Sequence, residues 1–142
     1  MWNVTPDEVG KLVACVDYSE ALTLTAGPRE ALAAAGDAKK YGFRAVVAFP
    51  WNLGVLVDAV KGSGVLAQIP VGFPSGCGTT KVKCAEAEEG LGRGATDLDM
   101  VMNIGAFKCG DYGKVAGDIA AVRAVAGPFK VPFKVIIEVG VL

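Results

Sequence analysis

The stretch DLDMVM, residues 97–102, decides the fold of this chain. Its apolar and charged side chains alternate, which is the two-residue period of a β-strand. One face therefore carries Leu98, Met100 and Met102, and the other carries Asp97 and Asp99. Charged groups are costly to bury unless they are paired, so a strand of this kind favours a sheet with one polar face.

A second strand of the same character is predicted at residues 133–139, where Val135 and Ile137 alternate with Lys134 and Glu138. Two strands that each have a polar face favour a (β/α)8 barrel, in which one side of every strand faces the barrel interior. They fit a doubly wound open sheet less well, because helices cover both of its faces and its central strands are almost wholly apolar. The alternative that both are edge strands with one solvated face remains open.

Strands and helices alternate along the whole chain. Strands are predicted at residues 13–16 (ending on Asp17), 44–49, 65–71, 97–102 and 133–139. Helices are predicted from residue 5, over 28–41, over 51–61, from 79 or 80 to 91, and over 111–126. Parallel strands need such crossover helices, so the fold class is α/β with a parallel sheet. We expect one domain over residues 1–142: a (β/α)8 TIM barrel truncated after strand five, or alternatively an open five-stranded parallel sheet of the flavodoxin type.

Composition excludes several classes of protein. The chain has 142 residues, of which 52% are hydrophobic and 20% charged, as expected for a globular domain and not for a disordered one. The formal net charge is -1, without the basic excess of a nucleic-acid-binding protein. There is no histidine, which excludes Ser-His or Cys-His catalysis and histidine metal ligands.

The sequence also predicts the compartment. The four cysteines, at positions 15, 77, 84 and 109, have no C-x-x-C spacing. The first ten residues include Asp7 and Glu8 and no apolar stretch, so no signal peptide is predicted. No window approaches the roughly 20 apolar residues of a membrane span. We therefore expect a reduced, cytoplasmic protein that binds neither membrane nor nucleic acid.

Several stretches, taken together, resemble the deoxyribose-phosphate aldolase family. They are GFPSG at 72–76 with the threonines at 79 and 80, GATDLDMVMNIGA at 94–106, GDY at 110–112, and KVIIE at 134–138. DYS at 17–19 stands where the family usually has Asp-His-Thr. These stretches are collinear and span nearly all of the chain. The resemblance implies a class I TIM-barrel aldolase that joins acetaldehyde and glyceraldehyde 3-phosphate reversibly through a lysine Schiff base, with no cofactor and no metal.

The resemblance also implies roles for individual residues. It makes Asp99 the acid–base residue and places Asp17 near the hydroxyls of the substrate. Asn103 would bond the substrate or a loop. Lys134 faces the barrel interior by strand parity and would pair with Asp99 or Glu138. The alternatives are a structural carboxylate at Asp99 and a turn-capping role for Asp17.

The Schiff-base lysine of the family is expected on strand six and the phosphate site on strands six to eight, and neither is found in this sequence. Lys134 is not the family's nucleophile. Lys81, Lys83 and Lys108 lie in helix or loop contexts, where a solvated surface position is expected.

Three hypotheses about function follow. In the first, the chain is part of an aldolase that acts on a phosphorylated sugar and short aldehydes, as a homodimer. In the second, it is an inactive half-barrel whose open strand edges pair with another copy. In the third, it is a small flavodoxin-like binding domain, although no Gly-rich phosphate loop follows the first strand.

Overall fold

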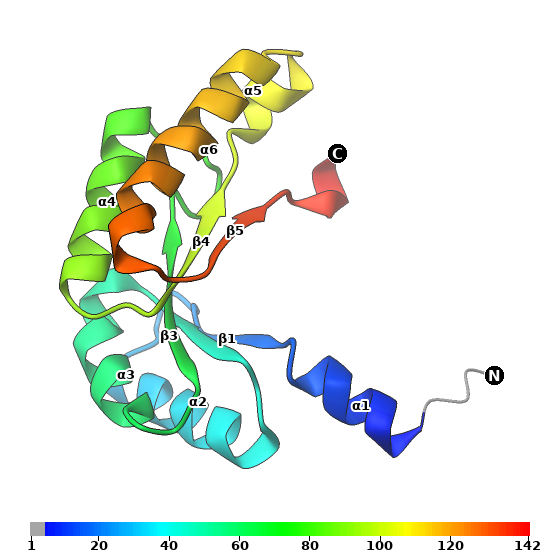
Figure 1. The fold of residues 1–142 in the computed structure, drawn as a ribbon, viewed down its shortest axis with the longest axis vertical. Helices are drawn as coiled ribbons and strands as arrows, with labels where there is room; N and C mark the ends of the chain where they lie inside the picture. Colours follow the sequence, from blue (N-terminus) through cyan, green and yellow to red (C-terminus); the bar gives the residue numbers. More distant parts are fainter. Residues whose placement is uncertain (1–4) are drawn as a thin grey trace. The chain divides into compact units, whose positions relative to one another are not determined.

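The computed structural model describes residues 5–142, without the side chains of residues 20 and 21. Helices and strands alternate along it, as predicted (Figure 1). The helices are α1 (Pro6–Val13), α2 (Pro28–Tyr41), α3 (Leu53–Val60), α4 (Thr80–Gly92), α5 (Ile104–Lys108) and α6 (Tyr112–Ala126). The strands are β1 (Asp17–Ala21), β2 (Ala45–Ala48), β3 (Leu66–Val71), β4 (Asp97–Val101) and β5 (Phe133–Ile136), and 3-10 helices cover Pro50–Asn52, Gly127–Phe129 and Val139–Val141. None of the helices between residues 5 and 142 is long and apolar enough to cross a membrane.

Each strand lies beside the next one along the chain, in the order β1-β2-β3-β4-β5. β1 pairs with β2, β2 with β3, and β4 with β5, all in parallel. A flavodoxin-like sheet would instead place β1 between β2 and β3. The observed order is that of consecutive strands in a (β/α)8 barrel. The flavodoxin-like alternative is therefore wrong for this chain.

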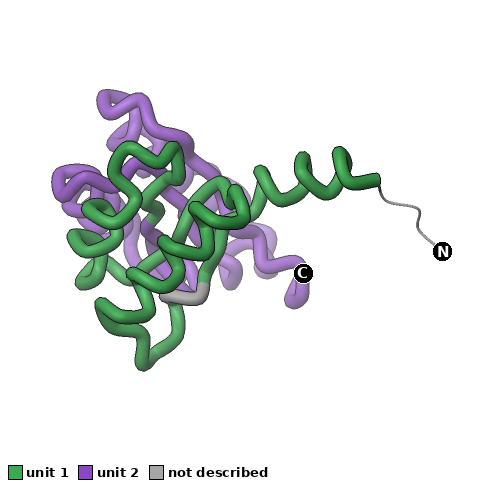
Figure 2. The backbone as a smooth tube through the Cα atoms, turned by 90° about the horizontal axis from the view of Figure 1, so that it is seen from below, with its two compact units in different colours: residues 1–68 green, residues 69–142 purple. Residues whose placement is uncertain are grey.

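The chain divides into two compact units, residues 1–68 and residues 69–142 (Figure 2). Unit 1 holds β1, β2 and the helices α1 to α3. Unit 2 holds β4, β5 and the helices α4 to α6, and the division falls within β3.

In unit 1, α2 packs on β1 and β2 through a face of alanines. Ala31, Ala34, Ala35 and Ala38 recur at helical spacing and are all buried. Because alanine has no side chain beyond Cβ, the helix backbone can approach β2 closely, and every residue of β2 is buried. The helix ends where it was predicted to end, at Gly42, which adopts the left-handed φ of +78° that glycine tolerates without steric cost.

In unit 2, α4 and α6 pack side by side, and α6 also contacts β4 and β5. α4 lies close on β3, because a Cβ built on Gly90 would collide with the Cδ1 atom of Ile69. Leu98 and Met100 of β4 are completely buried. The apolar face predicted for residues 97–102 is therefore part of the core.

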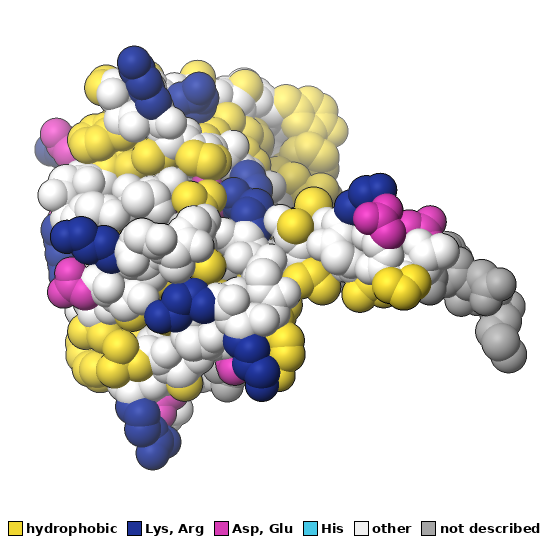
Figure 3. Space-filling view, turned by 60° about the horizontal axis from the view of Figure 1, so that its bottom comes forward, with side chains coloured by type: hydrophobic (Ala, Val, Ile, Leu, Met, Phe, Trp, Pro, Cys, Tyr) yellow, Lys and Arg dark blue, Asp and Glu magenta, His cyan; other side chains and the backbone are white. Residues whose placement is uncertain are grey.

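β1 begins at Asp17, the residue at which the first predicted strand was expected to end. Residues 13–16, expected to form a strand, complete α1 and the turn after it, and β1 starts at Asp17. The apolar residues at positions 9, 12, 13 and 16 recur with helical spacing, so the run continues the pattern of the helix. Figure 3 shows the hydrophobic side chains of α1 along one side of the helix and its charged side chains along the other.

Two further elements differ from the prediction. α5, only five residues long, was not predicted, because such a helix is too short to show a period in the sequence. β5 ends at Ile136 and does not continue to residue 139. Glu138 has a left-handed φ of +55°, which cannot continue an extended strand.

The Gly90 contact generates a stability prediction. We expect Gly90→Ala to lower the free energy of unfolding by about 2 kcal/mol, because the new methyl group overpacks the α4–β3 contact. Gly92→Ala is the control, since a Cβ there meets no atom within 4 Å. Urea denaturation of both variants is the measurement. Equal stability of the two variants would show that Gly90 does not determine the spacing of α4 and β3.

Candidate functional site

The polar face predicted for β4 and β5 carries a cluster of three charged side chains, here named the Lys134 cluster: Asp97, Asp99 and Lys134. Asp99 and Lys134 are register partners on neighbouring strands, so their side chains share a face. Lys134 Nζ lies 3.0 Å from Asp97 Oδ2 and 4.0 Å from Asp99 Oδ2. The predicted pairing of Lys134 with Asp99 is thus secondary to its pairing with Asp97, and Glu138 is outside the strand.

The two carboxylates of the Lys134 cluster differ in environment. The Asp97 side chain is fully buried, whereas that of Asp99 is 16% exposed and that of Lys134 is 37% exposed. A buried carboxylate beside an ammonium group is a structural ion pair. A partly accessible carboxylate can exchange a proton with a bound molecule. Within the cluster, Asp99 therefore has the better geometry for acid–base chemistry.

Asp17 lies in unit 1, where Arg44 and Gln68 contact its carboxylate. Arg44 Nε donates to Asp17 Oδ1 at 2.9 Å, and Arg44 Nη2 donates to Oδ2 at 3.3 Å. Gln68 Nε2 is 3.4 Å from the same Oδ2. The contacts with Arg44 and Gln68 fix the direction of the Asp17 carboxylate, and its role toward a substrate or a turn stays a prediction. Gln68 had one sequence signal, a polar residue within the apolar strand at 65–71, whereas Arg44 had none.

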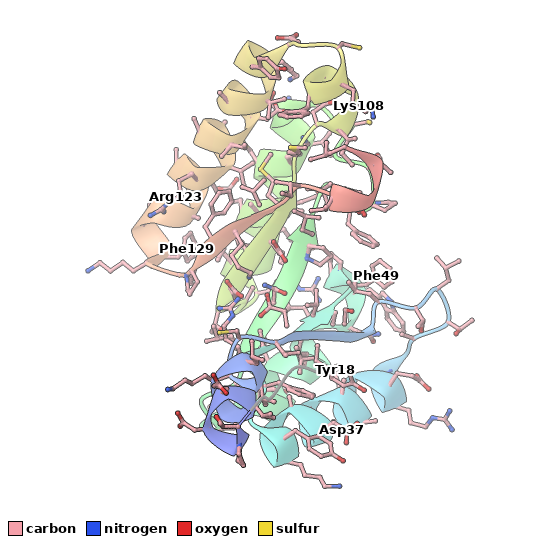
Figure 4. The ribbon with its side chains drawn as sticks, turned by 90° about the vertical axis from the view of Figure 1, so that its right-hand side faces the viewer. Tyr18, Asp37, Phe49, Lys108, Arg123 and Phe129 are labelled. Carbon is pink, nitrogen blue, oxygen red and sulfur yellow. The ribbon has the colours of Figure 1, made fainter. Side chains whose placement is uncertain are left out.

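Tyr18 stands where the aldolase family usually has histidine, and its ring packs on an aromatic neighbour. Its centroid lies 5.2 Å from that of Phe43, which in turn contacts Tyr41 at 5.8 Å. Figure 4 labels Tyr18 on β1. Successive residues of a strand point to opposite faces, so Tyr18 and Asp17 lie on opposite sides of β1.

Asn103 lies two residues after the end of β4 and is the N-cap of α5. Its Oδ1 accepts a hydrogen bond from the backbone N–H of Ala106 at 3.0 Å, which caps the helix. Asn103 was predicted to bond the substrate or a loop; the bond that the structure shows is to α5, and the contact with substrate stays a prediction. The cap fixes the direction in which the chain leaves the end of β4.

A network of four buried or half-buried side chains joins α4 to α6 in unit 2: Thr80, Lys83, Lys114 and Asp118. Lys83 was predicted at the surface, but its side chain is completely buried, with Nζ 3.0 Å from Asp118 Oδ2. Lys114 Nζ lies 2.8 Å from Asp118 Oδ1, and the Thr80 hydroxyl also donates to this oxygen. The prediction failed because the partner that permits burial lies 35 residues away in the sequence.

The same network sets the protonation of Asp118. Burial alone would raise the pKa of this carboxyl group, but hydrogen bonds from Lys114, Thr80 and Lys83 outweigh it and lower the pKa from 3.8 to about 2. Asp118 is therefore ionised throughout the neutral and mildly acidic range.

The described part of the chain contains no candidate metal site. Between residues 5 and 142, no three His, Cys, Asp or Glu side chains are grouped so that they would hold a metal ion. The four cysteines are free thiols, and those at positions 15, 77 and 109 are exposed.

Comparisons with known proteins identify the family that the chain resembles. No protein-family model matches. The chain is 43% identical over 106 residues to the deoxyribose-phosphate aldolase of Methanothermobacter thermautotrophicus, covering 75% of this chain and 46% of the relative. It is 43% identical over 102 residues to the enzyme of the same name from Aciduliprofundum boonei, covering 72% of this chain and 46% of the relative.

Solved structures give the same result for the fold. A Coccidioides immitis protein assigned to the deoxyribose-phosphate aldolases superposes with a TM-score of 0.87 at 31% identity, over 99% of this chain and 54% of that one. The tetrameric deoxyribose phosphate aldolase of Aeropyrum pernix gives 0.82 at 26% identity, over 94% and 55%. The predicted resemblance and the predicted barrel-type fold are confirmed. The chain spans about half the length of the relatives that it matches.

The Asp118 network predicts a dependence of stability on pH. A carboxyl group whose pKa is lowered in the folded state contributes stability above its unfolded pKa of 3.8, and this is lost as the pH falls through about 2. The contribution is about 2 kcal/mol, from 1.36 kcal/mol per pKa unit. We expect Asp118→Asn to remove this acid-dependent loss and to cost about 3–5 kcal/mol at neutral pH, because Lys83 stays buried without its carboxylate partner.

Urea denaturation between pH 2 and 7 measures both effects. Glu89→Gln serves as the control, since it breaks only the exposed pair with Arg93 and should cost less than about 1 kcal/mol. A small loss for Asp118→Asn, equal to that of Glu89→Gln, would contradict a stabilising role for the network.

The Lys134 cluster predicts that the two aspartates respond differently. We expect Lys134→Met to cost about 2 kcal/mol, because the ammonium group nearest to the buried Asp97 is removed. Asp99→Asn should cost less than about 1 kcal/mol, since the Lys134–Asp97 pair survives. Thermal unfolding monitored by circular dichroism compares the two variants. A larger loss for Asp99→Asn would mean that Asp99 is the structural partner of Lys134.

Proposed function

We propose that this chain, which matches deoxyribose-phosphate aldolases over three-quarters of its length, is the first five-eighths of the barrel of such an enzyme. The reaction is the reversible cleavage of 2-deoxy-D-ribose 5-phosphate to D-glyceraldehyde 3-phosphate and acetaldehyde through a lysine Schiff base. The observation that carries the proposal is the 43% identity to the Methanothermobacter thermautotrophicus enzyme, over 106 residues. The match covers 46% of that enzyme, so the remaining strands are proposed to come from residues outside this sequence.

In this proposal Asp99 moves protons. The lysine amine condenses with the carbonyl at carbon 1 and releases water, and the protonated imine then accepts the electron pair when the bond between carbons 2 and 3 breaks. The hydroxyl group at carbon 3 gives up its proton, and carbon 2 of the resulting enamine takes one. Water then hydrolyses the imine, which releases acetaldehyde and restores the lysine amine. A partly accessible carboxylate on the polar face of β4 suits both transfers, directly or through a water molecule. The protonated imine is the electron sink, so the proposed chemistry requires no metal or cofactor.

The other predicted residues support the carboxylate and the substrate. Lys134 holds Asp97 at 3.0 Å and lies 4.0 Å from Asp99, so it contributes positive charge beside the proton-transferring group. Asp17, oriented by Arg44, would accept a hydrogen bond from a substrate hydroxyl. Asn103 uses its Oδ1 to cap α5, and its amide Nδ2 would donate to the substrate.

We further propose that residues 1–142 belong to a single barrel domain of a cytoplasmic enzyme that forms a homodimer. β1 and β5 occupy the two ends of the strand order, and unpaired strand edges favour association with further strands. Exposed apolar residues follow β5, with Val139 74% exposed and Leu142 51% exposed. In the complete barrel the remaining strands would pair these edges, so the edges support self-association only in the alternative, an inactive half-barrel. The tetrameric Aeropyrum pernix relative supports an oligomer of the complete enzyme.

Borohydride trapping tests the proposed function. The 142-residue chain, incubated with acetaldehyde and sodium borohydride, is expected to form no covalent adduct, because the Schiff-base lysine lies outside it. A chimera with the C-terminal half of the Methanothermobacter thermautotrophicus enzyme is expected to form the adduct and to cleave deoxyribose 5-phosphate. Intact mass and coupled product assays are the measurements.

The role of Asp99 is tested in the same chimera. Asp99→Asn should lower kcat by about 100-fold or more, the usual effect of losing an acid–base group. The exposed Asp58 on α3 supplies a control, and Asp58→Asn should leave kcat unchanged. A wild-type rate for Asp99→Asn would remove Asp99 from the mechanism. An adduct on the 142-residue chain alone would show that a Schiff-base lysine lies within this sequence. An inactive chimera whose two halves only self-associate would favour the half-barrel alternative.

A further inference from the structure

The carboxylate of Glu86 attaches the loop between β3 and α4, residues 72–78, to α4. The backbone N–H of Gly72 donates to Glu86 Oε2 at 2.7 Å, a short and charge-assisted hydrogen bond. Gly72 directly follows the last residue of β3 and has a left-handed φ of +69°. Glu86 therefore holds the backbone at the point where the chain leaves the sheet.

Lys83 holds the same point from the preceding turn of α4. Residues 83 and 86 are three apart and share a face of the helix. A Cβ built on Gly72 would lie 3.2 Å from Cε and 3.5 Å from Cγ of Lys83. The apolar part of the lysine thus packs on Gly72, while its ammonium group is fixed by Asp118 at 3.0 Å.

The far end of the loop is pressed against β4. Gly76 has a φ of +67°, and a Cβ there would collide with the carbonyl group of Met102. The N–H of Gly76 donates to the carbonyl oxygen of Gly72 at 2.8 Å, which closes the loop on itself. The loop is thereby held between α4 and the carboxyl end of β4, the strand that carries Asp99. Its outer side is open, and Phe73 is 43% exposed.

We propose that Glu86 is a positioning residue: it fixes the loop 72–78 as a rigid wall against the end of β4, beside Asn103. The hydrogen bond to Gly72 ties the loop to α4, the contact at Gly76 transmits that position to Met102, and Asn103 follows in the chain. The importance of this wall for substrate rests on the proposed aldolase function. The positioning itself does not, and it is measurable on the chain as it stands.

Amide hydrogen exchange, measured by NMR on the 142-residue chain, tests the proposal. In the wild type, the Gly72 amide should be protected to the same degree as the amides of β3. Glu86→Ala should accelerate exchange at Gly72 and Gly76 by about tenfold or more and shift the Asn103 amide resonance, while the amides of α4 keep their protection. Glu86→Gln should restore most of the protection, because its side-chain carbonyl oxygen still accepts the bond.

Glu88→Ala is the matched control, since it removes the same charge from an exposed position on the same helix. It should leave exchange in the loop and the Asn103 resonance unchanged. Unchanged amide exchange at Gly72 and Gly76 in Glu86→Ala would overturn the proposal. So would amide exchange in Glu86→Gln that is as fast as in Glu86→Ala. If Glu86→Ala does not fold, the wild type still decides, because an unprotected Gly72 amide would exclude the bond. None of these results depends on catalysis, so an inactive chimera would not affect them.

Discussion

The two-residue alternation of β4 is the constraint on which the polar side of this sheet depends. Leu98 and Met100 occupy the buried apolar face, so Asp97 and Asp99 must lie on the other. Asp97 is itself fully buried, and a buried carboxylate needs a cation nearby. Lys134 supplies that cation only in the observed register, since a slip of one residue between β4 and β5 would turn it to the opposite face. The strand register and the ion pair therefore stabilise each other.

The parts of the fold that were predictable from the sequence are those with a local chemical cause. The ends of α2 and α4 follow from Gly42, which accepts a left-handed backbone, and from Thr79, whose side chain caps the helix. The position of β1 was wrong because the valines before Asp17 fit a helical period as well as a strand. The strand order was open for a different reason. It depends on pairing between distant segments, and no local residue reports whether β1 lies at the end of the order beside β2 or between β2 and β3.

The candidate site also has features that the sequence could predict and features that it could not. Strand parity was enough to place Asp99 and Lys134 on one face, and their register confirms it. Parity could not show which carboxylate pairs with Lys134, because Asp97 and Asp99 lie on the same face of β4. Only the distances from Lys134 Nζ, 3.0 Å to Asp97 and 4.0 Å to Asp99, distinguish the two. The burial of Lys83 was unpredictable because it depends on an aspartate of another helix. The hydrogen bond to Glu86 could not be predicted either, because its donor is the backbone N–H of a residue 14 positions earlier in the sequence.

The packing of α4 determines which of its positions can tolerate substitution. Lys83, Glu86, Ala87 and Gly90 lie on one side of the helix and meet, in order, an aspartate of α6, the loop after β3, the core and the side chain of Ile69. Each of these neighbours restricts the size or charge of the residue that faces it. The opposite side, at positions 81, 85, 88 and 92, is exposed throughout. Evolutionary variation in this helix is therefore expected to follow a 3.6-residue rhythm, with one face nearly invariant and the other free to adjust solubility and surface charge.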